Sequence, residues 1–150
     1  MDTNSIIGQL KDLSSASGNR DETLKEAVRL IHASNPRYNW TGIYLLEGDT
    51  LVLHNYIGKP TEHTHIQVGV GVCGTAVAET RDINVEDVTK LDNYLACSLE
   101  TRAEIVVLIK DSEKIYGQID IDSDTPGAFT DHDEQFLGKI ADHLATILGV

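Results

Sequence analysis

The sequence predicts an α+β domain in which helices pack on one side of an antiparallel sheet. Apolar residues recur at helical spacing near both ends of the chain, and two hairpin signals lie between them. The stretch between the hairpins, residues 58–100, is largely irregular, and such a long connection is typical of a functional segment. A length of 150 residues fits one domain with a sizeable core.

Two helices are expected before the first strand. The first carries a stripe of Ile6, Ile7, Leu10 and Leu13 and ends in the polar residues 14–19, so residues 1–18 form an N-terminal helical extension. The second covers about residues 21–33 and stops before Pro36, because the residue that precedes proline avoids the helical conformation.

Alternating and β-branched runs define the strands. Strands are expected at residues 39–46, 50–56, 65–68, 104–110 and 115–122. Tight polar turns at residues 47–49 and 111–114 join the first two strands and the last two strands into hairpins. A short helix is expected at residues 74–79.

The last helix begins at Thr130, and Asp133 stands where a capping box needs its acidic side chain. Its buried face is predicted to comprise Phe136, Leu137, Ile140, Leu144, Ile147 and Leu148.

Net charge and composition exclude several classes of partner. A formal charge of −12 argues against nucleic acid and anionic membrane surfaces, since both are negative. The N-terminus lacks the basic start and apolar run of a signal peptide, so a cytoplasmic protein is expected. The two cysteines, Cys73 and Cys97, are not expected to form a permanent disulfide there, although a transient redox disulfide is compatible with that compartment.

Both cysteines lie in segments that suggest a site. Cys97 is in a polar loop before the most apolar run, and Cys73 is in the glycine-rich segment 69–75, Gly-Val-Gly-Val-Cys-Gly-Thr. A helix that starts there would lower the pKa of Cys73 and offer N–H groups to an anion. The alternative is a tight turn that holds a small buried cysteine.

Acidic side chains alternate along the second hairpin. Asp120 and Asp122 share one face of their strand, and Glu104 starts the strand that pairs with it. Three acids that face one pocket would bind an ammonium group or hold a proton with a raised pKa. A solvent-facing side of the sheet is the alternative.

Other side chains give weaker signals. Trp40 and Tyr44 share a strand face and either belong to the core or wall an apolar slot for a thioether-like group. His63 and His65 could offer two imidazoles to a metal, but no third ligand is evident nearby, so neither a metal nor a cofactor is expected.

The combination of these segments resembles the free methionine-R-sulfoxide reductases, which are single GAF domains. The resemblance covers about residues 20–148 and rests on residues 39–46, 70–78, 92–97, 104–106, 120–123 and 129–133. It implies a single GAF-like domain over residues 1–150, with a central antiparallel sheet, the terminal helices on one face and a loop-rich ligand pocket on the other.

The resemblance also implies the chemistry. Cys97 matches the nucleophile that attacks the sulfoxide, releases methionine and becomes a sulfenic acid, which a second thiol and then thioredoxin reduce. The substrate pocket of that family falls on Trp40, Tyr44, Glu104, Asp120 and Asp122.

One cysteine of the family is missing. His63 stands about where its main resolving thiol belongs, so Cys73 or an external thiol must resolve the sulfenic acid. Free methionine-R-sulfoxide is the expected partner, with thioredoxin or another thiol reductant. A non-catalytic GAF module that binds a similar small molecule and a thiol redox sensor remain alternatives. The apolar stripe on the first helix favours packing on the domain or on a second copy, so a homodimer is expected.

Overall fold

The computed structural model describes residues 2–91 and 99–149. Six strands form one antiparallel sheet in the order β3-β2-β1-β6-β5-β4, which confirms the predicted α+β class. The strands are β1 (Trp40–Glu47), β2 (Thr50–Ile57), β3 (His65–Gln67), β4 (Ile83–Val85), β5 (Ala103–Lys110) and β6 (Ile115–Ser123). The helices are α1 (Thr3–Ser17), α2 (Arg20–Ala33), α3 (Gly71–Glu79) and α4 (Asp131–Leu148), with a 3-10 turn η1 (Val88–Lys90).

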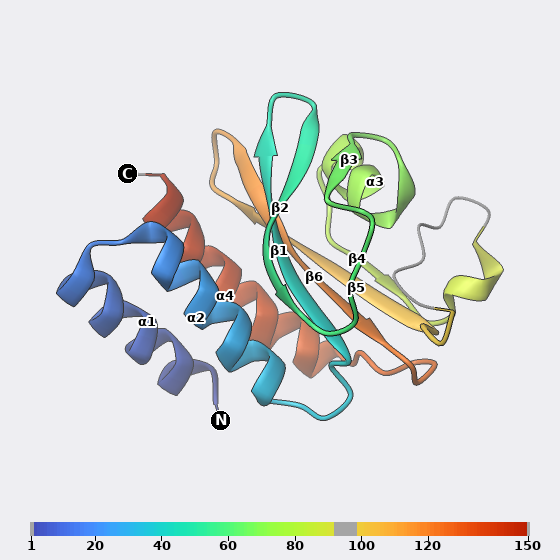
Figure 1. The fold of residues 1–150 in the computed structure, drawn as a ribbon, viewed down its shortest axis with the longest axis horizontal. Helices are drawn as coiled ribbons and strands as arrows, with labels where there is room; N and C mark the ends of the chain where they lie inside the picture. Colours follow the sequence, from blue (N-terminus) through green and yellow to red (C-terminus); the bar gives the residue numbers. More distant parts are fainter. Residues whose placement is uncertain (1, 92–98, 150) are drawn as a thin grey trace.

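The sheet separates two apolar clusters. On one face, inward side chains of the central strands pack on α1, α2 and α4, which lie together on that side of the sheet (Figure 1). On the other face, α3 and the segment that leads to it cover a smaller cluster around Tyr44 and Val106. The terminal helices therefore occupy one face and the irregular middle of the chain the other, as predicted. Within residues 2–91 and 99–149, no helix is long and apolar enough to cross a membrane.

Several boundaries differ from the sequence prediction. The first helix continues to Ser17. The polar residues that were expected to end it are helical, and the helix ends at Gly18. Gly18 adopts φ +63°, a left-handed conformation that suits glycine, and its N–H bonds the carbonyl of Ser14. The middle of the chain also holds β4 and η1, which were not predicted.

The apolar stripe of α1 is covered within the chain. Ile6 and Leu10 are fully buried in the cluster that α2 and α4 share, and Ile7 packs at its edge. The stripe thus packs on the domain, the first of the two outcomes expected for it. The stripe therefore no longer supports a homodimer, and the homodimer stays a prediction.

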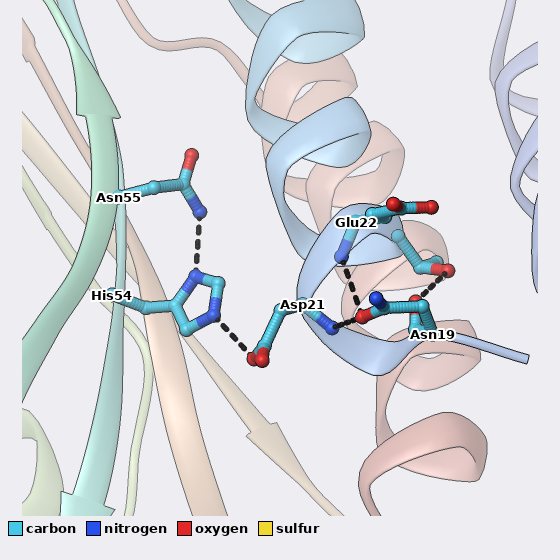
Figure 2. A network of polar contacts seen from close by, with 6 residues as sticks. Asn19, Asp21, Glu22, His54 and Asn55 are labelled. Atoms are coloured by element: carbon cyan, nitrogen blue, oxygen red, sulfur yellow. Dashed lines mark hydrogen bonds and ion pairs between the residues drawn. The ribbon is translucent and has the colours of Figure 1, made fainter.

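A polar network fixes the start of α2 against β2 (Figure 2). The side chain of Asn19 accepts hydrogen bonds from the N–H groups of Asp21 and Glu22, as an N-cap residue does. Nε2 of His54 lies 2.8 Å from Asp21, and Asn55 contacts the other ring nitrogen at 2.9 Å. The hydrogen bond with His54 holds the pKa of Asp21 below its ordinary value. The helix is therefore tied to the sheet at its first turn.

The start of α4 depends on Asp133. Its carboxylate accepts hydrogen bonds from the N–H and hydroxyl of Thr130, which completes the predicted capping box, and from the hydroxyl of Tyr38. Burial alone would raise the pKa of Asp133, but the bonds from Tyr38 and Thr130 outweigh it and hold this pKa below its ordinary value.

We expect Asp133→Asn to lower the free energy of unfolding by about 1–2 kcal/mol at pH 7, because an amide cannot accept all of these bonds. A lowered folded-state pKa contributes stability above the unfolded pKa of about 4, and that contribution is lost as the pH falls through the folded pKa. Urea unfolding at pH 7 and at pH 3 measures both effects. The exposed Asp131→Asn is the matched control, and a difference between Asp133→Asn and wild type that does not shrink in acid would contradict the role of the carboxylate.

Candidate functional site

Three carboxylates are buried on the face of the sheet opposite the terminal helices. We call Glu104, Asp120 and Asp122 the carboxylate cluster; their exposed fractions are 4%, 1% and 2%. Glu104 on β5 lies directly across from Asp122 on β6, and Asp120 is two residues before Asp122. The predicted shared face is therefore present, and the alternative of a solvent-facing side is wrong, because α3 and the chain before it cover these strands.

A small cavity lies against the cluster. It has a volume of about 10 Å³, which is room for roughly one water molecule. Its lining residues are Tyr44, His63, Ile66, Val72, Cys73, Glu104 and Asp120. Two of the three predicted acids and one of the two predicted aromatic residues thus reach the same cavity. Asp122 and Trp40 are not among the lining residues.

The environment of Cys73 contradicts the predicted acidified thiol. The side chain is 4% exposed, and its Sγ lies 3.8 Å from a carboxylate oxygen of Glu104. Burial first, and then the charges of Asp120 and Glu104, raise the pKa of the thiol well above its ordinary value. Although Cys73 is in the first turn of α3, these effects outweigh the helix dipole. Cys73 is a protonated, buried thiol.

The glycines around Cys73 serve close packing. Gly69 and Gly71 have φ values of +94° and +65°, which side chains with a Cβ rarely adopt. A Cβ on Gly74 would lie 2.4 Å from the carbonyl oxygen of Gln67 at the end of β3. The segment lets α3 approach β3. Cys73 is a small buried side chain, as the alternative expected, but it stands in the first turn of a helix, as the other interpretation expected.

Trp40 and Tyr44 lie on the same face, as predicted, with ring centroids 6.5 Å apart. Trp40 stacks on Tyr56 at 5.3 Å and donates its indole N–H to the carbonyl of Lys59. Tyr44 is fully buried and donates its hydroxyl to the carbonyl of His63 at 2.7 Å. Tyr44 therefore holds the segment around His63 over the cavity, and Trp40 holds the adjoining segment.

Asp120 is the most constrained acid. Burial raises the pKa of its carboxyl, although hydrogen bonds with Glu104 and Cys73 work in the opposite direction. Its Oδ1 is buried and has no hydrogen-bond partner. A carboxyl of this kind favours its protonated form or interacts with a cation that enters the cavity.

Sequence reasoning missed Gln118. It is fully buried, two residues before Asp120 on the same face of β6, and both polar atoms of its amide have no partner. The period-two pattern Gln118, Asp120, Asp122 carried this signal, but a single amide in a strand has many structural explanations.

The predicted imidazole pair does not form a metal site. His65 is exposed at the start of β3, whereas His63 lies before the strand and lines the cavity. Among the described residues, the one group that brings three metal-type ligands together is Cys73, Glu104 and Asp120, whose donor atoms all lie within 4.8 Å of one another. Cys97, the predicted nucleophile, falls outside the described residues.

Comparisons with known proteins fit this geometry. The GAF domain model matches residues 19–148. The free methionine-R-sulfoxide reductase of Escherichia coli is 42% identical over 126 residues, which are 84% of this chain and 76% of that protein.

Two solved structures share the fold along most of their length. The type II free methionine-R-sulfoxide reductase from Thermoplasma acidophilum has a TM-score of 0.81 and 37% identity, covering 93% of this chain and 94% of that one. The Neisseria meningitidis reductase, solved in complex with its substrate, has a TM-score of 0.88 and 28% identity, covering 98% of this chain and 88% of that one. This chain therefore belongs to the GAF domain family and is related to the free methionine-R-sulfoxide reductases.

Proposed function

We propose that this protein reduces free methionine-R-sulfoxide to methionine, with Cys97 as the nucleophile. The observation that carries the proposal is the carboxylate cluster, which is buried beside a cavity and holds an unpartnered oxygen on Asp120. Buried acids need a proton or a cation close by. The α-ammonium group of a free amino acid supplies such a cation, and relatives of this chain act on free methionine-R-sulfoxide.

The three acids of the carboxylate cluster have different roles. Glu104 and Asp122, which face each other across β5 and β6, hold the substrate ammonium. Asp120, whose pKa burial raises, keeps a proton and donates it to the sulfoxide oxygen as the S–O bond weakens. Tyr44 lines the cavity and the ring of Trp40 lies 6.5 Å from that of Tyr44, and these rings form the apolar wall for the methyl thioether end.

Thiols alone supply the two electrons that the reduction of the sulfoxide needs. The Cys97 thiol attacks the sulfoxide sulfur, the oxygen moves to Cys97 as a sulfenic acid, and methionine leaves as the reduced product. A second thiol then attacks the sulfenic sulfur, releases water and forms a disulfide, which thioredoxin or another thiol reductant opens. This chemistry needs no cofactor and suits the cytoplasm, where thiols are kept reduced.

Entry of the substrate requires a rearrangement. A cavity of about 10 Å³ admits one water molecule and not a methionine sulfoxide. Tyr44 ties the carbonyl of His63 across the cavity, so the segment around His63 must shift when the amino acid binds.

The decisive measurement is turnover of free methionine-R-sulfoxide coupled to NADPH through thioredoxin and its reductase, repeated with glutathione. The S epimer and peptide-bound methionine sulfoxide are the matched control substrates. Turnover of the free R epimer alone supports the proposal. Specific binding without turnover under any thiol reductant would instead favour the non-catalytic GAF module, and reversible thiol oxidation without either would favour the redox sensor.

The residue at position 63 is expected to affect the step in which oxidised Cys97 is reduced again. Cys73 is buried with a raised pKa, which makes it a slow resolving thiol. We expect His63→Cys to increase multiple turnover with thioredoxin severalfold and to leave the first-turnover rate unchanged, because attack on the substrate and resolution use different thiols. Stopped-flow and steady-state assays separate the two. His65→Cys, two residues along and exposed, is the control. If wild type recycles as fast as His63→Cys, Cys73 resolves efficiently and no thiol is missing.

A further inference from the structure

The small cavity has the size of an ion rather than of an amino acid. Its volume of about 10 Å³ holds one water-sized occupant. The Sγ of Cys73 and carboxylate oxygens of Glu104 and Asp120 line it and lie within 4.8 Å of one another. All three residues are at least nine-tenths buried. The cavity therefore presents a thiol and two carboxylates to a single point.

An independent observation points to a ligand at this arrangement. Oδ1 of Asp120 is buried, belongs to a residue that lines the cavity and makes no hydrogen bond. A buried polar atom without a partner is rare in native structures and is explained by a ligand, a water molecule or an ion. Here the residue that carries this atom also contributes a donor to the group formed with Cys73 and Glu104.

We propose that Cys73, Glu104 and Asp120 bind a Zn²⁺ ion, with His63 as the fourth donor. Tetrahedral zinc with bonds of about 2.0–2.3 Å places its donors roughly 3.3–3.8 Å apart. Sγ of Cys73 and Oε2 of Glu104 are already 3.8 Å apart, and the donor atoms of Cys73, Glu104 and Asp120 all lie within 4.8 Å of one another, so these three need shifts of about 1 Å to reach tetrahedral spacing. His63 is the one lining residue of this cavity, among those described, that carries an imidazole.

The donor set selects zinc over other common cations. Thiolate and imidazole are ligands that zinc accepts and that Ca²⁺ and Mg²⁺ do not prefer. The ion enters with release of the protons of Cys73 and Asp120 to solvent, and its two positive charges offset two of the three negative charges of the thiolate and the carboxylates. No oxidation or reduction takes place.

This site goes beyond the proposed function and does not depend on it. The ion would use Glu104 and Asp120, which in the proposed function hold the substrate ammonium and protonate the sulfoxide oxygen, so zinc and methionine sulfoxide exclude each other. Zinc binding would also occupy Cys73 and remove it from disulfide exchange. A protein that binds zinc but reduces no sulfoxide would retain this proposal and lose the other.

The test uses the full chain, reduced and freed of metal, titrated with Zn²⁺ against a chromogenic chelator and with Co²⁺ by absorption spectroscopy. We expect one ion per chain, a thiolate-to-cobalt charge-transfer band and tetrahedral d–d bands. Cys73→Ser is expected to remove the charge-transfer band and weaken zinc binding at least 100-fold. Asp120→Asn and His63→Ala are each expected to weaken it at least 10-fold.

Matched variants keep the test decisive. Cys97→Ser and His65→Ala are expected to bind zinc as wild type does, because neither residue is in the donor set. Thermal unfolding reports on folding, since zinc should raise the melting temperature of wild type and of Cys97→Ser but not of Cys73→Ser. A cobalt spectrum without the charge-transfer band, or a Cys73→Ser variant that binds zinc as tightly as wild type, would overturn the proposal.

Discussion

Cys97→Ser is expected to abolish the release of methionine from free methionine-R-sulfoxide, with a loss of at least about 1,000-fold in single-turnover rate. The serine hydroxyl is a weak nucleophile near neutral pH and cannot accept the sulfoxide oxygen in a form that thiols reduce. The measurement mixes excess reduced enzyme with substrate and quantifies methionine by chromatography. No external reductant is present, so recycling does not affect the result.

Cys73→Ser is the matched control for this experiment. Cys73 is buried, and the charges of Asp120 and Glu104 help to raise its pKa, so it is protonated and unsuited to attack. Its replacement should leave the first turnover largely intact and affect only later cycles. If Cys73→Ser stops the first turnover and Cys97→Ser does not, the two roles are reversed and the proposed mechanism is wrong.

Asp120→Asn is expected to lower kcat/KM for the free R-sulfoxide by about 100-fold, the contribution of a positioned general acid. The amide keeps the shape of the side chain but cannot protonate the leaving oxygen. In wild type, kcat should fall as the pH rises through the raised pKa of Asp120, because the proton is then lost. The variant should lack this alkaline limb. Steady-state kinetics over a pH series that starts near the ordinary carboxyl pKa of about 4 and extends upward give both results.

Glu104→Gln separates binding from proton transfer. It should raise KM more than it lowers kcat, because Glu104 interacts with the ammonium group and not with the reacting oxygen. Neither variant should be markedly less stable, since removing a buried carboxyl charge removes a desolvation penalty. The exposed Asp142→Asn serves as the control for charge. Equal loss of activity in Asp142→Asn would show that overall charge, and not the carboxylate cluster, sets the rate.

Local sequence patterns determined most of the secondary structure. The run from Glu104 to Lys110 and the alternation around Asp120 and Asp122 defined the second hairpin, because strand periodicity is a property of neighbouring residues. The capping box at Thr130 and Asp133 placed the start of α4 for the same reason. The three-residue strand β4 was not predicted, since it is defined by its pairing with β5 and not by a local pattern.

The alternation also placed the carboxylate cluster on one face. It could not decide whether that face meets water. That depends on α3 and on the chain around His63, which lie 25 to 41 residues before Glu104 in the sequence and pack over β5 and β6. The sequence alternatives of a solvent face and a buried pocket were therefore both consistent with the pattern.

Cys73 shows most clearly the difference between what local sequence and what the packing of distant segments determine. The sequence determined that a small side chain stands among glycines in the first turn of a helix, and from the dipole alone it predicted an acidic thiol. Only the tertiary structure brought that thiol 3.8 Å from Glu104 and removed it from water, which reverses the direction of its pKa shift. Helix starts and strand faces follow from residues a few positions apart. Burial and electrostatic environment depend on the packing of distant segments, which no local pattern records.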